Sequence, residues 1–214
     1  MREKPRHEVQ RVRQRAHYDE PTVHAVLDAG WLAHVAFAGA GQQPFVIPML
    51  YVREERSLLL HGSIASRLMR TLGDGIDACV CATLVDGLVL ARSHFHHSVN
   101  YRSVVAFGRA RPVGDGDGKA AALARFVDAM IPGRAGESRP ADRNELAATA
   151  LLRFDIADAS AKIRSGGPKD DPADAGLPIW SGVVPMALRC GEPLVADDAT
   201  PGLAVPASVR TLAG

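Results

Sequence analysis

The chain has 214 residues, 47% of them hydrophobic, and its 25 Lys and Arg nearly balance 24 Asp and Glu to give a net charge of +1. This length suits one large domain with appendages, and the balanced charge argues against nucleic-acid binding and against a polybasic membrane-surface protein. We expect a soluble cytoplasmic protein for three reasons. The three cysteines have no framework spacing, no apolar run reaches roughly 20 residues, and the charged start is not followed by a signal-like stretch.

Residues 1–17 carry many charges and show no apolar periodicity, so we expect them to form a flexible arm. The first half of the domain then reads as strands joined by turns. A short helix with Thr22 as its N-cap and Gly30 as its stop precedes them. The predicted strands span residues 31–38, 45–52 and 57–61. Within the second of these, Pro48 must lie at an edge, a bulge or an end because it cannot donate a ladder hydrogen bond.

A helix over residues 64–72 separates these strands from a second group. Strands are predicted over 76–85 and 88–93, joined by the tight-turn dipeptide Asp86-Gly87, and over 101–113. A glycine-rich loop at 114–118 leads into helices over 119–130 and 144–148, and then into a final strand over 151–156. With six or more strands and short connections, we expect residues 18–188 to form a mainly β barrel with flanking helices. Residues 189–214 show little periodicity and read as a tail.

The most informative segment is His61-Gly62-Ser63-Ile64-Ala65-Ser66-Arg67, where a strand ends and a helix begins. Free N–H groups at a helix start favour an anion, and we take Ser63 as the N-cap. Ser66 and Arg67 supply a hydroxyl and a guanidinium to hold a phosphate. The alternative is an ordinary cap with one surface arginine.

Other side chains could assist such a site. One is His61, whose imidazole exchanges protons near neutral pH, and others lie at the polar start of the predicted strand 101–113. Tyr101, Arg102 and Ser103 combine an aromatic ring, a cation and a hydroxyl there. Lys162 and Arg164 add two cations on one face if their segment is extended. Each of these groups taken alone is a weak signal, because isolated basic residues are usually solvated.

A metal site is the less favoured interpretation of His94, His96 and His97. His94 and His96 share a face in an extended segment, but no Cys, Asp or Glu stands at ligand spacing around them. Cys79 and Cys81 point in parallel on one strand face, which is poor geometry for a disulfide. We therefore expect polar strand ends, core cysteines and no metal centre.

Taken together, these segments resemble the flavin-nucleotide-binding branch of the pyridoxamine 5′-phosphate oxidase-like superfamily, which also contains the nitroimidazole-resistance proteins. The resemblance runs from about Tyr18 to Pro185. The segments that carry it are Phe45–Tyr51, His61–Leu68, Asp86–Ser93, His96–Val104, Phe107-Gly108, Pro132-Gly133-Arg134 and Ser160–Arg164.

The resemblance implies a split β-barrel of Greek-key type that binds FMN at a homodimer interface. Ile47, Pro48 and Met49 would then run past the isoalloxazine ring, with His61 beside it as the candidate catalytic group. Ser66 and Arg67 would take the phosphate of FMN. The remaining implied contacts, some of them from a second subunit, are Tyr101, Arg102, Ser103, Lys162, Arg164 and Trp180.

The arginine-tryptophan pattern with which the true oxidases recognise pyridoxamine phosphate is missing near the C-terminus, so vitamin B6 oxidation is not expected. Three hypotheses remain. The first is an FMN-dependent oxidoreductase acting on a small, for instance nitro-aromatic, substrate. The second is a non-catalytic protein that stores or senses flavin. The third keeps the barrel but exchanges the cofactor for haem or a deazaflavin, with slight support from the three clustered histidines.

Overall fold

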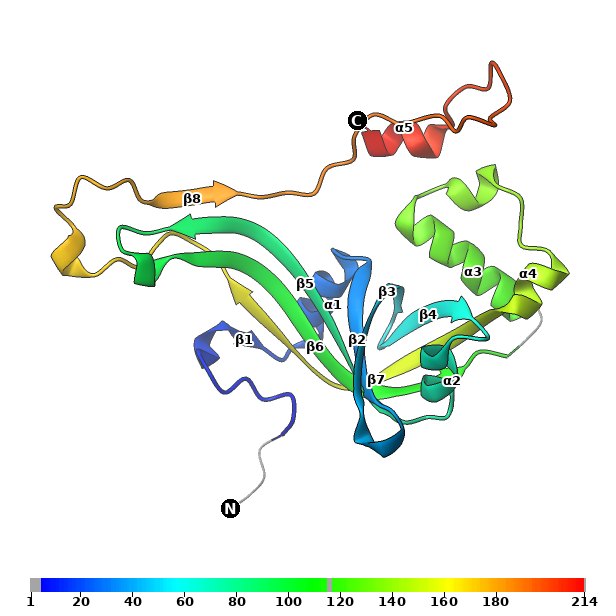
Figure 1. Ribbon diagram of the computed structural model, residues 1–214, viewed down its shortest axis with the longest axis horizontal. Helices are drawn as coiled ribbons and strands as arrows, with labels where there is room; N and C mark the ends of the chain where they lie inside the picture. The colour runs from blue at the N-terminus through cyan, green and yellow to red at the C-terminus, as the bar shows by residue number, and fades with distance from the viewer. Residues whose placement is uncertain (1–4, 115–116, 214) are drawn as a thin grey trace.

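The computed structural model describes residues 5–114 and 117–213, and it contains one antiparallel sheet that closes on itself (Figure 1). Its strands follow the order β1-β7-β4-β3-β2-β5-β6, and a further pairing of β6 with β7 closes a six-stranded ring. This confirms the expected mainly β barrel with flanking helices. The strands are β1 (Ala16–His17), β2 (Leu32–Ala38), β3 (Pro44–Glu54), β4 (Ser57–Ser63), β5 (Asp77–Leu90), β6 (Ser98–Pro112), β7 (Thr149–Arg164) and β8 (Gly182–Pro185).

Helices cover the barrel or lie at its margins. They are α1 (Glu20–Asp28), α2 (Arg67–Gly73), α3 (Asp117–Met130), α4 (Arg143–Ala148) and α5 (Ala207–Ala213). Single turns of 3-10 helix, including η3 (His94–His96) and η4 (Arg134–Glu137), connect some of these elements. The predicted loop at 114–118 lies partly outside the described residues, since 115 and 116 are not among them.

Alternation along the strands divides the core in two. In β2, Ala33, Val35 and Phe37 are buried inside the barrel while their neighbours lie outside or part-way, as a period of two requires. Outside the barrel, Leu59 of β4 packs under Phe126 of α3 in a second, smaller cluster. Burying each such side chain contributes roughly 1.5–3 kcal/mol. The barrel and its α3 cover therefore fold around separate apolar layers.

The hairpin formed by β5 and β6 runs beyond the barrel as an extension (Figure 1). The expected turn at Asp86-Gly87 is wrong: β5 continues through it to Leu90 and keeps its pairing with β6, with a register shift between Val85 and Gly87. A Cβ on Gly87 would lie 2.9 Å from the carbonyl oxygen of Val184. The glycine therefore permits the close approach of β8 rather than a chain reversal.

The limits of one helix and one strand also differ from the expectation. Helix α1 begins at Glu20, because Asp19 is its N-cap and accepts the amide of Thr22 at 2.9 Å. The final predicted strand reaches Arg164, since β6 pairs with β7 along its length after β4 has ended. Strand β8 and helix α5 were not expected, because neither is long enough to show a period.

Candidate functional site

The open edge of β3 carries three of the predicted cofactor residues. Ile47, Pro48 and Met49 pair with β2 on one side, whereas β4 pairs only with Tyr51–Glu54. Among the described residues, no strand pairs with the other edge of β3 between 45 and 50. Pro48 thus lies in an edge segment, as expected. Backbone groups along this edge remain available to a ligand.

The start of α2 lies beside this edge. The guanidinium carbon of Arg67 is 4.7 Å from the ring centroid of Phe45 on β3, a cation–π contact that holds the two elements together. Arg67 is exposed and has no ion-pair partner in the described ranges 5–114 and 117–213. The structure thereby places Arg67 against Phe45, at the start of the strand that carries Ile47, Pro48 and Met49. Sequence reasoning missed Phe45 as the platform, although an aromatic residue at a strand start was the available signal.

The helix start differs in detail from the expectation. Helix α2 begins at Arg67, so Ser66 rather than Ser63 is the N-cap. The hydroxyl of Ser63 accepts the amide of Ala65 at 3.2 Å, and the amide of Ser66 donates to the carbonyl of Ser63 at 2.9 Å. These turn contacts delay the helix by one turn. The hydroxyl of Ser66 makes no capping hydrogen bond and is free to bind a ligand.

His61 lies on the outward face of β4, under α3. Its ring meets that of Phe126 edge-on at a centroid distance of 4.4 Å. Its Nδ1 atom is buried without a hydrogen-bond partner, and burial lowers the pKa of the imidazole below 6.5. His61 is therefore a neutral imidazole near neutral pH. His61 lies within β4, two residues before Ser63, and its ring packs against Phe126 of α3.

A second group of predicted residues meets across β6 and β7. Tyr101 pairs with Arg164 and Ser103 with Lys162, and the hydroxyl of Ser103 donates to the carbonyl of Lys162 at 3.3 Å. Their side chains share the outward face of the sheet because they alternate with inward residues. The rows of Ser103 and Tyr101 continue to Thr83 and Val85 of β5. They end there, because β2 pairs with β5 only over Ala78–Cys81, so no shared row links this group to the β3 edge.

Arg102 and Arg164 are already engaged by the protein. Arg102 makes a two-pronged pair with Asp86, at 2.7 Å and 3.0 Å, and sits on the other face of β6 from its neighbours. Arg164 is buried and donates to the side chain of Asn100 and to the carbonyls of Gly166 and Gly167. Both guanidinium groups hold local structure, so neither is free to receive a phosphate as placed.

Trp180 lies apart from the other predicted residues, just before β8. Its side chain is 65% exposed, and its indole covers Gly182, where a Cβ would come within 2.9 Å of the ring. In one protomer, Trp180 thus presents an open aromatic surface. It does not join the β3 edge.

The tip of the β5–β6 extension holds the three clustered histidines. The Nδ1 atom of His97 lies 2.8 Å from the carbonyl oxygen of Ser93, and since a carbonyl only accepts, this nitrogen carries the proton. The Nε2 atom then has a free lone pair. Phe95, in the same turn, is 89% exposed. Within the described ranges, no group of three or more His, Cys, Asp or Glu is arranged to hold a metal ion by itself.

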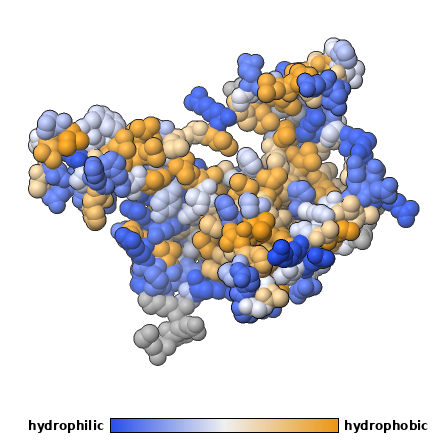
Figure 2. All heavy atoms as spheres, in the orientation of Figure 1, coloured by the Kyte–Doolittle hydropathy of each residue, from blue (hydrophilic) through white to orange (hydrophobic). Residues whose placement is uncertain are grey.

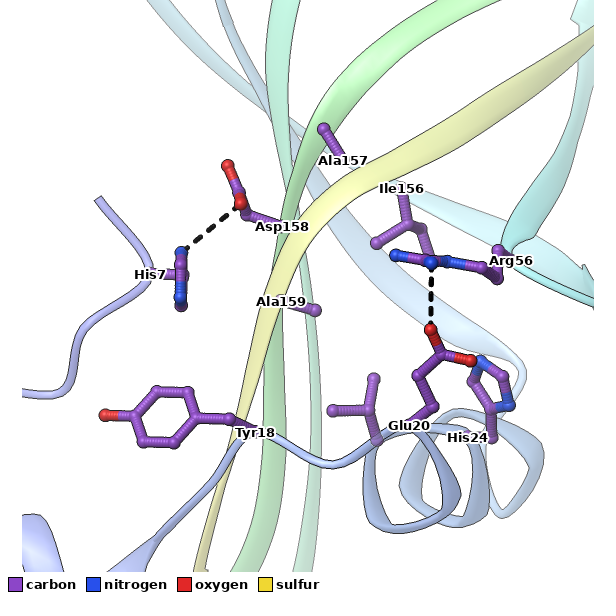
Figure 3. A pocket seen from close by; sticks show the side chains of 10 residues that line it. His7, Tyr18, Glu20, His24, Arg56, Ile156, Ala157, Asp158 and Ala159 are labelled. Atoms are coloured by element: carbon purple, nitrogen blue, oxygen red, sulfur yellow. Dashed lines mark ion pairs between the residues drawn. The ribbon is translucent and has the colours of Figure 1, made fainter. Parts of the chain in front are cut away.

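A pocket of about 190 Å³ lies where the N-terminal arm meets the barrel (Figure 3). His7 of the arm approaches Asp158 of β7 at 3.5 Å, and Arg56 pairs with Glu20 at 2.9 Å. Arg6 adds contacts to Asp158 at 3.2 Å and to Asp77 at 3.5 Å. The arm that the sequence portrays as flexible is thus placed against the barrel, and the charges around this pocket are already paired.

Five pockets of 100–500 Å³ on the described part of the chain are lined by none of the predicted cofactor residues. In a single protomer these residues lie on open surface or between packed elements. Ligand sites normally bury 70–90% of a small molecule. These five pockets therefore give the predicted cofactor residues no such enclosure.

Comparison with known proteins identifies the family. The family described as Pyridoxamine 5'-phosphate oxidase matches residues 19–163. The match covers most of the chain, including every strand of the closed ring, and the protein belongs to this family. A comparison with curated proteins gave no match.

Two solved structures resemble nearly the whole chain. The flavocytochrome Anf3 from Azotobacter vinelandii is 39% identical, with 99% of this chain and 98% of that chain covered and a TM-score of 0.90. An FAD and haem binding protein from Mycobacterium smegmatis is 37% identical, with coverages of 94% and 98% and a TM-score of 0.88.

A third structure shares the fold alone. A Bacteroides thetaiotaomicron protein assigned to 5-nitroimidazole antibiotic resistance is 16% identical, covers 69% of this chain and 86% of its own, and has a TM-score of 0.59. No helix among the described residues is long and apolar enough to cross a membrane.

Proposed function

We propose that this protein binds a flavin nucleotide together with haem and passes electrons between a redox partner and these groups. The observation that carries the proposal is the extent of the two full-length likenesses. The family match ends at residue 163, whereas the flavocytochrome and the FAD- and haem-binding protein resemble the chain to its C-terminal region. At 37–39% identity, the segments outside the barrel are shared with proteins that hold both groups.

The β3 edge and the start of α2 fit the flavin. The unpaired backbone edge at 45–50 offers donors and acceptors to a flat heterocycle, and Arg67 with Ser66 offers a cation and a hydroxyl to a phosphate. We favour FAD over the FMN implied by the family resemblance, because a full-length relative is described as binding FAD. The 16% identity of the nitroimidazole-resistance relative carries no substrate to this chain.

The tip of the extension fits haem. A histidine that ligates a metal usually donates its other ring N–H to a carbonyl or carboxylate, which fixes the tautomer and directs the free nitrogen. His97 has this arrangement through Ser93, and the exposed ring of Phe95 offers an apolar surface beside it. We therefore assign His97 as the residue that would hold the haem iron when haem is bound. Haem and flavin together supply one- and two-electron chemistry.

A second protomer completes the site in this proposal. The support is that predicted residues on the outward sheet face, such as Tyr101 and Lys162, are only half-buried in one chain. A homodimer would cover them and bury the cofactors. Trp180 would then be available to the neighbouring chain.

The absorbance spectrum of a His97→Ala variant tests the haem assignment. We expect the purified parent to show flavin bands and a haem Soret band, and the variant to lose the Soret band while keeping the flavin bands. The matched control is His96→Ala, which changes the neighbouring ring but has no carbonyl contact of this kind. An unchanged Soret band in His97→Ala would show that another residue ligates the iron, and a parent with no flavin bands would refute the proposed function.

A further inference from the structure

Two cysteines lie side by side on the outward face of β5, on the body of the molecule and not among the hydrophobic residues that gather on the extension (Figure 2). Cys79 and Cys81 are two residues apart in an extended strand, so their side chains point to the same side of the sheet, roughly 6–7 Å apart at the backbone. The residues that alternate with them, Ala78, Val80 and Ala82, are buried in the barrel core. Both thiols are free and half-buried, so they lie outside the core in which we expected them.

The contacts of the pair within the chain are weak. The sulfur of Cys81 lies 3.8 Å from the hydroxyl of Thr83, the next residue on the same face. Across the ladder, Cys79 pairs with Ala36 of β2 and Phe107 of β6. Neither of these two neighbours carries a polar side chain, so neither competes for the sulfur of Cys79.

The spacing of the two thiols suits a bridging ion better than a disulfide. A disulfide needs the two Cβ atoms within about 3.5–4.5 Å, closer than neighbouring positions on one strand face allow. An ion held by two sulfurs, at the Zn–S length of about 2.3 Å, spans at most about 4.6 Å between them. Two cysteine side chains that lean toward each other from these positions reach that span.

The number of available ligands selects the metal. His34 of β2 lies across the ladder from Cys81 and is exposed, but no group of three or more His, Cys, Asp or Glu in the described part of the chain is placed to hold a metal ion. Structural zinc takes four ligands, so two thiols do not satisfy it. Soft thiolates favour Cu(I), an ion that accepts two sulfur ligands.

A cation lies close to the pair. The guanidinium carbon of Arg6 is 5.1 Å from the ring centroid of Phe107, which pairs with Cys79 across the ladder. Burial and then the neighbouring Cys81 raise the pKa of the Cys79 thiol, whereas Arg6 opposes this rise. The Cys79 thiol is therefore protonated near neutral pH until a metal cation replaces its proton. The anion formed by Cu(I) and two thiolates carries one negative charge, which the guanidinium of Arg6 favours.

We propose that Cys79 and Cys81 bind Cu(I) as a two-thiolate site on the outward face of β5. Two copper–sulfur bonds form, each thiol releases its proton to solvent, and no electron is transferred. The site goes beyond the proposed function, because it uses neither the β3 edge nor the tip of the extension. It gives the chain a means of holding a soft metal ion without a cofactor.

Copper retention tests the site. The purified protein is reduced, kept free of oxygen, mixed with Cu(I) in an excess of the chelator bicinchoninate and desalted, and its copper is counted by atomic emission. We expect about one copper ion per chain in the parent. In Cys79→Ser and Cys81→Ser, the dissociation constant for Cu(I) should rise at least about a hundredfold, because loss of a ligand costs more than loss of a supporting group. Circular dichroism checks that both variants fold.

Cys190→Ser is the matched control, because Cys190 is exposed but stands alone in the sequence. It should hold copper as tightly as the parent. A parent that retains no copper, or a loss in Cys190→Ser equal to that in Cys79→Ser, would overturn the inference.

Alkylation gives a second test that needs no substitution. Bound copper should protect Cys79 and Cys81 of the parent from iodoacetamide, whereas Cys190 should react at the same rate with and without copper, as read by peptide mass spectrometry. Equal protection of all three cysteines, or no protection of the pair, would contradict the site. Both tests count copper and thiols rather than absorbance, so the copper site can fail while the cofactor proposal stands, and the reverse.

Discussion

Arg67 is the residue on which the flavin proposal depends most. It is exposed, rests on the ring of Phe45 and lacks an acidic partner within the described ranges, whereas Arg102 and Arg164 are engaged by the protein. We expect Arg67→Ala to weaken flavin binding about 10- to 100-fold, because a charge-assisted hydrogen bond to phosphate contributes about 1.5–3 kcal/mol. Quenching of flavin fluorescence on titration measures the change.

Arg70 provides the control for this prediction. It lies one turn further along α2, is also exposed, and has no contact with the β3 edge. Arg70→Ala should bind flavin as tightly as the parent. Equal losses in both variants would mean that the general charge of α2, and not a phosphate contact at Arg67, governs affinity.

His61 makes the stability of the fold depend on pH. Burial against Phe126 lowers the pKa of His61 in the folded state below 6.5, so the unfolded chain binds the proton more readily. The contribution of the neutral ring is present above pH 6.5 and is lost as the pH falls below that value. When the pH is lowered from about 7.5 to about 5, we expect the Tm of His61→Phe to fall less than the Tm of the parent. An equal loss in both would show that His61 does not titrate on unfolding.

At the scale of the elements, the crossing of β6 and β7 is the least tolerant contact. The register shifts between Phe107 and Gly108, and a Cβ on Gly108 would lie 1.9 Å from the carbonyl oxygen of Asp155. We expect Gly108→Ala to lower the free energy of unfolding by at least about 3 kcal/mol, because the strands must separate to admit a methyl group. Denaturant unfolding measures it.

The control for this change is Gly167→Ala, where nothing lies within 4 Å of the added carbon. It should leave the free energy of unfolding within about 0.5 kcal/mol of the parent. If Gly108→Ala were equally harmless, the strands would have to be further apart at this crossing than the register indicates.

The elements also show how far the sequence can be interpreted. Alternation in β2 and the edge position of Pro48 were predictable because local patterns and proline chemistry determine them. The Asp86-Gly87 dipeptide misled because a turn signal and a glycine needed for close strand approach look alike in sequence. The start of α2 shifted because side-chain and backbone contacts around Ser63 form a turn first.

The candidate site was predictable in part for a similar reason. The contact between Arg67 and Phe45 joins the start of α2 to the start of β3, two segments that the resemblance assigns to one cofactor. That Ile47, Ser66 and Arg67 bind this cofactor stays a prediction. The ion pair between Arg102 and Asp86 was not predictable, because it depends on β5 continuing as a strand through Asp86-Gly87. The path of segment 186–206 was not predictable either, since an extended segment without periodicity has no local signature.

At the scale of the whole molecule, the chain has three parts: the barrel, the extension formed by β5 and β6, and the exposed C-terminal segment 186–206. The closed ring supplies a rigid frame, the extension carries His97 away from the barrel, and segment 186–206 has exposed apolar side chains. A single chain exposes 13786 Å², and the homodimer proposed above would bury part of this surface. The full-length likeness to proteins that hold flavin and haem fits such an assembly.

Native mass spectrometry of the purified protein tests the central claim most directly, because it weighs the assembly with its bound groups. We predict a species of two 22.8 kDa chains carrying flavin and haem, and denaturation should release FAD and haem at their own masses. A single chain that carries neither group, even after incubation with FAD and haem, would contradict the account.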